Sequence, residues 1–350
     1  MGKKKVAVLH AQVPFVRAGA ELLVENLTKQ LKIRGFDAEI VSLPFKWYPN
    51  NTLLDSYLAW HMLDLTESNG QKIDLVIATK VPTFMIQHPN KVVWLMHQFR
   101  TAYDLQDNGP AGGCNTIPGG KELKHKIVHM DNLALSSIKP IYTISKTVTN
   151  RLKQYNGIES APLYHPPALA GKYFTENYED YVLSVGRLDP NKRVDLLIRA
   201  LPYCDPHIRA VIAGAGAIRQ DLEELAERLN VKNRVDFLGY VPDEDLPRLY
   251  ANALAVCFTP IDEDYGYITL EAFLSQKPII TCNDAGGVLE FARDKENAIV
   301  CKNDPKEIGE GFNRFYYHKN LAKEYGQCGF ESVKDIKWDR VIDTLTQSIN

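Results

Sequence analysis

Residues 184–193 have the sequence SVGRLDPNKR. An apolar run from Tyr181 predicts a β-strand that ends near Gly186, and the periodic segment after it predicts a helix over 193–201. Gly186 allows a ligand to approach the backbone, and Arg187 and Lys192 follow, five residues apart. Two cations before a helix N-terminus favour an anion, because the helix dipole already attracts negative charge there. This chemistry suits a diphosphate, although two surface cations beside a turn would give the same pattern.

Strands and helices alternate on both sides of this segment. Near-continuous apolar strands separated by helices indicate parallel sheets that are covered on both faces. Before the segment we expect strands at 5–10, 38–43, 75–78, 92–96 and 141–144, and helices at 21–34, 55–65 and 146–154. After it we expect strands at 209–213, 235–238, 254–258 and 278–281, helices at 218–229, 243–251 and 270–275, and a helical end from 304 to 349.

The chain reads as two domains in tandem. Its 350 residues exceed one ordinary core, and the run YHPP at 164–167 suits a linker because two prolines fix the backbone. We expect Rossmann-like domains at 1–166 and 167–330, with a last helix in 331–350 that crosses back to the first domain. The predicted fold class is α/β, with two doubly wound parallel-sheet domains facing a central cleft. Ligands of such sheets bind beyond the carboxyl ends of the strands.

Between 103 and 124 the periodic pattern fails. The runs NGPAGG at 108–113 and PGG at 118–120 make this a long Gly- and Pro-rich segment. Long loops in compact domains are usually functional or mobile. We expect an acceptor-binding or lid loop here, with a disordered insertion as the alternative.

The bulk composition narrows the function classes. A formal net charge of -2 leaves no excess of cations for general nucleic-acid binding. We find no apolar run long enough for a transmembrane helix, and the six cysteines lack metal-ligand spacing, so they read as free thiols in a reducing compartment. The expected location is therefore cytoplasmic. A basic cluster at 121–126 leaves a transient contact with the inner face of a membrane open, although a solvated helix start explains it better.

A second motif, EDYGYITLE at 263–271, carries two carboxylates eight residues apart. We expect Glu271 on the first turn of a helix, where it can accept the two hydroxyl groups of a ribose diol. Glu263 precedes Gly266 on a loop within reach of a sugar. Complementing the helix dipole is the structural alternative for Glu271.

The two motifs together resemble the retaining GT-B glycosyltransferases of family 4. Members of that family show a strand ending in Gly-Arg, a Lys five residues later, and then a Glu-x7-Glu pair. The likeness extends over nearly the whole chain, with matching segments at 18–21, 214–216, 235–241 and 285–290 and at His97 after the strand at 92–96. Departures from the family's usual residues occur at Ala18, Asp264, Ile268 and Leu289, and those at Ala18 and Asp264 put sugar and acceptor preference in doubt.

The resemblance implies a transfer of a hexose-type sugar, with retention of configuration, from a UDP- or GDP-linked donor to a glycan, lipid-linked or small-molecule acceptor. Cations stabilise the departing diphosphate, aided by backbone amides near Gly19 and Gly287, and neither a cofactor nor a metal ion is needed. The implied catalytic residues are Arg187, Lys192, Glu263 and His97. The implied donor-binding residues are Glu271, Gly19, Gly186, Gly214, Tyr240, Val241, Gly266, Tyr267, Ile268 and Gly287.

Two other functions share the same diphosphate site. One is a GT-B-like sugar-nucleotide epimerase, which would need an acid/base set around the sugar and no acceptor loop. The other is a non-catalytic sugar-nucleotide-binding subunit, which would be free to lose Lys192 and Glu263. A nicotinamide site is disfavoured, because the segment at 214–216 lacks the third glycine of a dinucleotide fingerprint.

Overall fold

The computed structural model describes residues 2–48, 50–107 and 113–349. The chain forms two compact units. The first runs to Ala168 and includes the residues from Lys337 on, and the second is Leu169–Ile336. Each unit holds a six-stranded parallel sheet, so the expected α/β fold of two Rossmann-like, doubly wound domains is confirmed.

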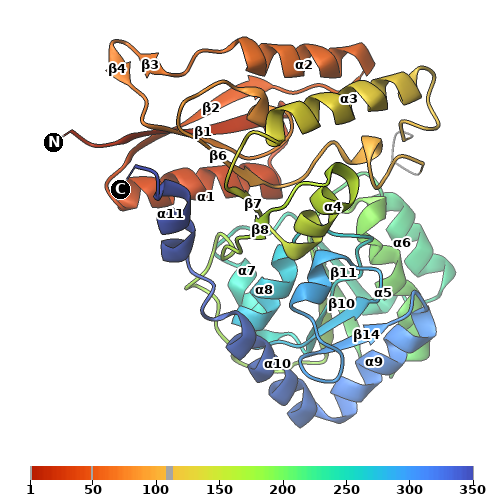
Figure 1. Ribbon diagram of the computed structural model, residues 1–350. Coiled ribbons are helices and arrows are strands. Elements are labelled where there is room, and N and C mark those ends of the chain that lie inside the picture. The colour runs from red at the N-terminus through yellow and green to blue at the C-terminus, as the bar shows by residue number, and fades with distance from the viewer. Residues whose placement is uncertain (1, 49, 108–112, 350) are drawn as a thin grey trace. The chain divides into compact units, whose positions relative to one another are not determined.

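The first unit has the strand order β2-β1-β5-β6-β7-β8. Its strands are β1 (Lys5–Gln12), β2 (Asp37–Pro44), β5 (Leu75–Ala78), β6 (Lys91–Leu95), β7 (Ile141–Thr143) and β8 (Ala161–Pro162). Its helices are α1 (Gly19–Ile33), α2 (Asn50–Met62), α3 (Gly120–Leu135), α4 (Lys146–Asn156) and α11 (Trp338–Thr346). Figure 1 shows α1 and α11 on one face of the sheet and α2 and α3 on the other. The last helix therefore packs on the first unit.

The core of the first unit follows directly from its apolar pattern. The strand Leu75–Ala78 is buried along its whole length, because helices cover both faces of the sheet. Helix α1 places Leu23, Leu27 and Leu31 on its buried side, at the spacing of one helical face.

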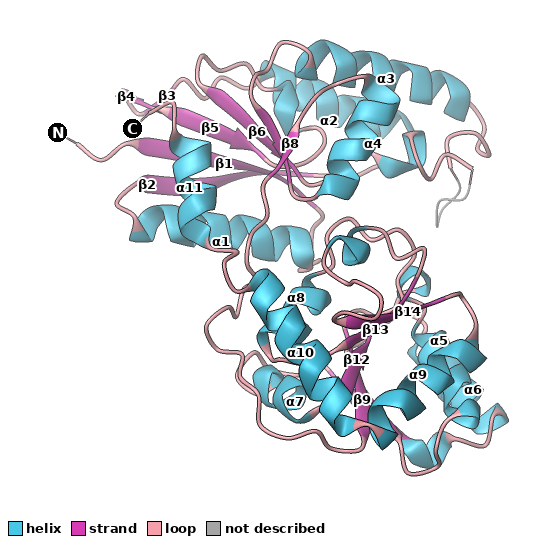
Figure 2. Cartoon of the chain, turned by 60° about the horizontal axis from the view of Figure 1, so that its bottom comes forward, coloured by secondary structure: helices cyan, strands magenta, loops and turns pink. Residues whose placement is uncertain are grey.

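The second unit has the strand order β11-β10-β9-β12-β13-β14. Its strands are β9 (Tyr181–Val185), β10 (Arg209–Ala213), β11 (Val235–Gly239), β12 (Ala255–Cys257), β13 (Ile279–Cys282) and β14 (Ala298–Cys301). Its helices are α5 (Val194–Ala200), α6 (Arg219–Arg228), α7 (Leu246–Asn252), α8 (Tyr267–Leu274), α9 (Pro305–Tyr317) and α10 (Lys319–Val333). Figure 2 shows α7, α8 and α10 on one side of the sheet and α5, α6 and α9 on the other. The strand order reverses at β9, and such a switch point is where doubly wound sheets bind ligands.

Two local expectations were wrong. The segment predicted as a loop over 103–124 is shorter, because α3 already begins at Gly120, after Gly119 in a left-handed conformation. A small hairpin of β3 (Glu67–Ser68) and β4 (Gln71–Lys72) was not predicted at all. Most of the Gly- and Pro-rich run, residues 108–112, lies outside the described residues.

Among the described helices, none combines the length and apolar character that crossing a membrane requires.

Candidate active site

Two contacts made by glycines shape the carboxyl edge of the second sheet. Gly186 follows β9 with φ of +126°, and Gly214 follows β10 with φ of +156°. A Cβ atom on Gly214 would lie 1.8 Å from the carbonyl oxygen of Gly186, so only glycine lets these strand ends come together. A Cβ atom on Gly186 would lie 3.4 Å from Cδ1 of Ile268, at the start of α8. The predicted residues Gly186, Gly214 and Ile268 therefore meet at one place.

The two predicted cations differ in how tightly they are held. Arg187 is 57% exposed, and its Nη1 lies 3.0 Å from Oδ2 of Asp189. A surface ion pair of this kind is weak, so the guanidinium can exchange Asp189 for another anion. Lys192 ends a short 3-10 turn, is only 18% exposed, and forms an ion pair with Glu263. The fold thus brings together two predicted catalytic residues that lie 71 positions apart.

A second loop fixes the backbone of Glu263. Its N–H donates to the carbonyl of Ala285 at 3.2 Å, and the Gly287 N–H donates to the carbonyl of Glu263 at 2.7 Å. A Cβ atom on Gly286 would come within 2.7 Å of the Glu263 backbone. The glycines at 286 and 287 therefore let the two loops run side by side. Because the Gly287 N–H donates to the backbone of Glu263, Gly287 helps to fix the position of Glu263.

Glu271 lies on the second turn of α8, and the expectation that it lies on the first turn was wrong. The helix begins earlier, at Tyr267, because Gly266 takes the N-cap position with φ of +81°. The hydroxyl of Tyr250 donates to Oε2 of Glu271 at 2.7 Å. Burial raises the pKa of Glu271, and the hydrogen bond from Tyr250 opposes that rise.

Arg193 is a central residue of this region that the sequence did not reveal. Its buried guanidinium donates to the carbonyl of Thr259 at 2.7 Å, to that of Pro260 at 2.9 Å, and to Oδ2 of Asp284 at 2.8 Å. It therefore joins the Lys192 turn to the loops after β12 and β13. Because it begins the helix predicted over 193–201, it read as an ordinary first helical residue.

The remaining predicted residues follow β11 in the second unit or belong to the first unit. Tyr240 is 75% exposed after Gly239, at the end of β11, and Val241 beside it is partly buried. In the first unit, His97 follows β6 with Nδ1 2.7 Å from the carbonyl oxygen of Gln98. Gly19 is the first residue of α1.

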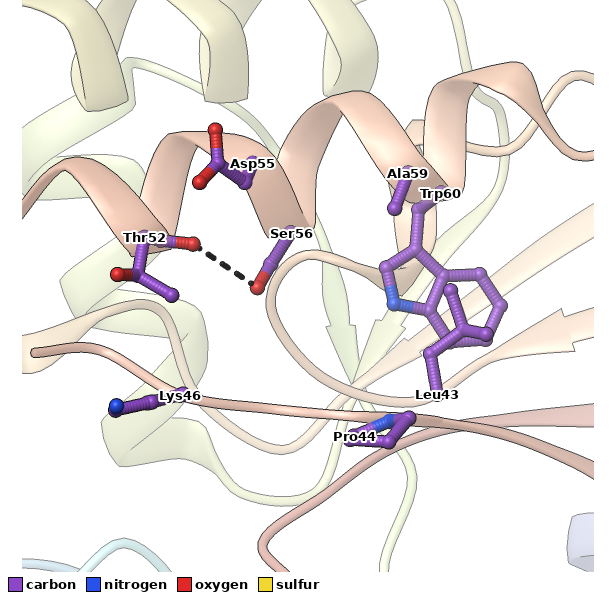
Figure 3. A pocket seen from close by; sticks show the side chains of 8 residues that line it. All are labelled: Leu43, Pro44, Lys46, Thr52, Asp55, Ser56, Ala59 and Trp60. Carbon is purple, nitrogen blue, oxygen red and sulfur yellow. Dashed lines mark hydrogen bonds between the residues drawn. The ribbon is translucent and has the colours of Figure 1, made fainter.

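A pocket in the first unit lies apart from these residues. It sits between the end of β2 and α2, where Ser56 donates to the carbonyl of Thr52 at 3.3 Å (Figure 3). Its lining residues are Leu43, Pro44, Lys46, Thr52, Asp55, Ser56, Ala59 and Trp60. None of the predicted site residues lines it. Among the described residues, no group of three or more His, Cys, Asp or Glu side chains is arranged to hold a metal ion.

Comparisons with known proteins agree with this architecture. Residues 170–331 match the family of glycosyl transferases group 1. Over 204 residues the chain is 29% identical to an uncharacterized glycosyltransferase, MJ1607, of Methanocaldococcus jannaschii, covering 57% of this chain and 50% of that protein. Over 315 residues it is 23% identical to the alpha-1,3/1,6-mannosyltransferase ALG2 of Dictyostelium discoideum, covering 76% and 72%. The chain thus spans about half the length of the first of these relatives.

Among solved structures, Alr3699/HepE of Anabaena in complex with UDP and glucose superimposes with a TM-score of 0.70. The match is 18% identical in sequence and covers 99% of this chain and 98% of that one. At this identity it supports the fold. Residues 170–331 are therefore similar to the glycosyl transferases group 1, and the chain has a GT-B fold.

Proposed function

We propose that the protein is a retaining glycosyltransferase of family 4. It moves a hexose-type sugar from a UDP- or GDP-linked donor to a hydroxyl group of a glycan, lipid-linked or small-molecule acceptor. The observation that carries this proposal is the pairing of Lys192 with Glu263 next to the glycine cluster at the switch point of the second sheet. The comparisons name glycosyltransferases, so neither the epimerase nor the binding-subunit alternative gains support from them.

Charge stabilisation is the chemistry that these residues supply. When a glycosyl bond to a diphosphate breaks, negative charge builds up on the phosphate and positive charge on the sugar ring. Arg187 and Lys192 stabilise the departing diphosphate, and no metal ion or cofactor is required in this proposal. Glu263 faces the sugar and stabilises the ring's positive charge. The leaving phosphate accepts the proton of the acceptor hydroxyl, so that no separate base is needed.

In the ligand-free chain both cations already have carboxylate partners. Arg187, which is more than half exposed, exchanges its partner Asp189 at little cost, because water screens the pair. Lys192 stays near Glu263, which places one positive and one negative group side by side. Such a pair matches a reacting centre whose phosphate and ring develop opposite charges.

The proposal also covers residues of the first unit, the cellular location and the choice of donor. In the first unit, the proposal assigns His97 a catalytic role and Gly19 a role in donor binding. All six cysteines are free thiols, which fits a reducing cytoplasm. The relative ALG2 is named a mannosyltransferase and the neighbour HepE was solved with UDP and glucose, so both UDP- and GDP-linked hexoses belong in the test.

A ligand screen tests the donor site. The midpoint of thermal unfolding is measured with UDP, GDP, dTDP and ADP and with their sugar conjugates. A nucleotide at 100 times its Kd raises the free energy of unfolding by about 2.7 kcal/mol. We expect one base to give such a shift and Lys192→Ala to abolish it. Donor turnover should fall by at least about tenfold in Arg187→Ala, Lys192→Ala and Glu271→Ala.

Lys302→Ala serves as the matched control, because Lys302 is 80% exposed and its nearest carboxylate, on Glu307, is 3.8 Å away. This variant should keep both the shift and the turnover. Equal turnover in the three site variants and in the control would show that the site has been assigned to the wrong residues.

A further inference from the structure

Glu271 is held by tyrosines and not by a cation. Among the described residues, no Lys or Arg nitrogen forms an ion pair with it, and Asp243 nearby adds a like charge that raises its pKa further. Tyr250 donates to one carboxylate oxygen, and the hydroxyl of Tyr173 lies close enough to act on the same group. Tyr267, on the same helix, lies close enough for the charge of Glu271 to raise the pKa of its phenol, although burial is the larger cause of that rise. Hydroxyl donors of this kind favour the charged form of the carboxylate and oppose the effect of burial on its pKa.

The position of Tyr250 is fixed from several directions. Its side chain is completely buried, and the ring of Tyr173 packs edge-on against it with centroids 5.7 Å apart. The carbonyls at the end of α7 are satisfied by the preceding segment of the second unit. Tyr181 donates its hydroxyl to the carbonyl of Leu249 at 2.6 Å, and the Glu176 N–H donates to that of Ala251 at 2.9 Å. The last turn of the helix is therefore anchored, and the Tyr250 hydroxyl is directed to one place.

We propose that Tyr250 is a positioning residue, which holds one oxygen of Glu271 so that the other accepts the ribose hydroxyls of the donor. This inference rests on the proposed function, in which Glu271 binds the ribose. The Tyr250 hydroxyl donates its one hydrogen to Oε2, and the Tyr173 hydroxyl lies close to the same carboxylate. Each carboxylate oxygen has two lone pairs, so Oε1 still has room to accept from a ligand. Without it, the buried carboxylate loses both its orientation and part of its stabilisation as an anion.

Tyr250→Phe removes the hydroxyl and keeps the ring. The Kd values of UDP and GDP, and of their 2′,3′-dideoxy analogues, are measured for the wild type and the variant. We expect the variant to bind the normal nucleotide at least about fivefold more weakly, as for a lost charge-assisted contact, and the dideoxy analogue as well as the wild type does. Because the Tyr250 hydrogen bond lowers the pKa of Glu271, its loss should also move the acid limb of nucleotide binding to higher pH.

Tyr181→Phe is the matched control. It removes a hydroxyl that holds the end of α7 but does not touch Glu271. It should lower the unfolding temperature while leaving the difference between normal and dideoxy nucleotides unchanged. If Tyr250→Phe weakens both nucleotides equally, or behaves like the control, the positioning role is refuted. If the wild type binds a nucleotide in a Lys192-dependent way but Tyr250→Phe equals it, only this inference fails. If no nucleotide binds the wild type, the proposed function and this inference both fail.

Discussion

Arg193 has a left-handed backbone, with φ of +49°, which an arginine adopts only at a cost in free energy. Its hydrogen bonds to the carbonyls of Thr259 and Pro260 and to the carboxylate of Asp284 offset that cost. We expect Arg193→Ala to lower the free energy of unfolding by about 2 kcal/mol, a figure reduced because Asp284 is half-exposed. Arg193→Gly should lose about 1 kcal/mol less, because glycine accepts this backbone conformation. Urea unfolding of the three proteins measures both differences. If the glycine and alanine variants are equally stable, the backbone of Arg193 is not strained. If both are as stable as the wild type, the hydrogen bonds of the Arg193 side chain do not stabilise the fold.

At the same scale, the sequence predicted some site residues and missed others. The Lys192–Glu263 pair joins residues that the motifs had already singled out. Arg193 and Tyr250 were missed for a physical reason. A left-handed arginine has no sequence signature, since the conformation depends on contacts with distant loops. Tyr250 lies in a short apolar helix, where its ring reads as core and its hydroxyl partner is 21 residues away.

Helix α1 begins without a side-chain cap, because Ala18 occupies the N-cap position. Glu21 replaces that cap by accepting the Ala18 N–H at 2.9 Å, and it also contacts Nε2 of His10 at 3.4 Å. Burial raises the pKa of Glu21, but His10, the Ala18 N–H and the charge of Lys80 outweigh it and lower the pKa from 4.5 to about 2. Since the folded pKa lies below the unfolded one, this stabilisation is present above pH 4.5 and is lost as the pH falls towards 2.

Glu21→Gln should therefore destabilise the protein by about 2–3 kcal/mol at pH 7 and by much less near pH 2.5. Chemical denaturation at both pH values measures the two differences. Glu25→Gln on the same helix is the control, because its ion pair with Arg17 is exposed and should contribute under about 0.5 kcal/mol. Equal losses of stability in the two variants, or an effect of Glu21→Gln that does not change with pH, would show that ionised Glu21 does not stabilise the start of α1.

At the scale of the whole chain, strand positions were the most predictable feature. The strands at 75–78, 181–185 and 209–213 lie where the apolar runs predicted them, because burial on both faces leaves a continuous signal. The start of α3 was missed because Gly119 and Gly120 read as loop residues, whereas a left-handed Gly119 forms its N-cap. The hairpin over 67–72 has exposed polar strands and leaves no periodic signal.

The last helix makes the stability of the first unit depend on residues far along the chain. Trp338 packs edge-on against the completely buried Trp94, with ring centroids 6.2 Å apart, and also contacts His165. All four tryptophans of the chain lie in the first unit, at positions 47, 60, 94 and 338, so tryptophan fluorescence reports on that unit alone. We expect Trp338→Ala to lower the free energy of unfolding of this unit by about 3 kcal/mol or more.

In that variant the thermal transition followed by fluorescence should move to lower temperature, while a second transition, seen by circular dichroism, stays in place. Phe312→Ala is the reciprocal control, because Phe312 is completely buried in the core of the second unit. It should move the second transition and leave the fluorescence transition where it is. A fluorescence transition that Trp338→Ala leaves unmoved would show that α11 does not stabilise the first unit. Equal movement of both transitions in each variant would show that the two units unfold together, and the free energies would then belong to the whole chain.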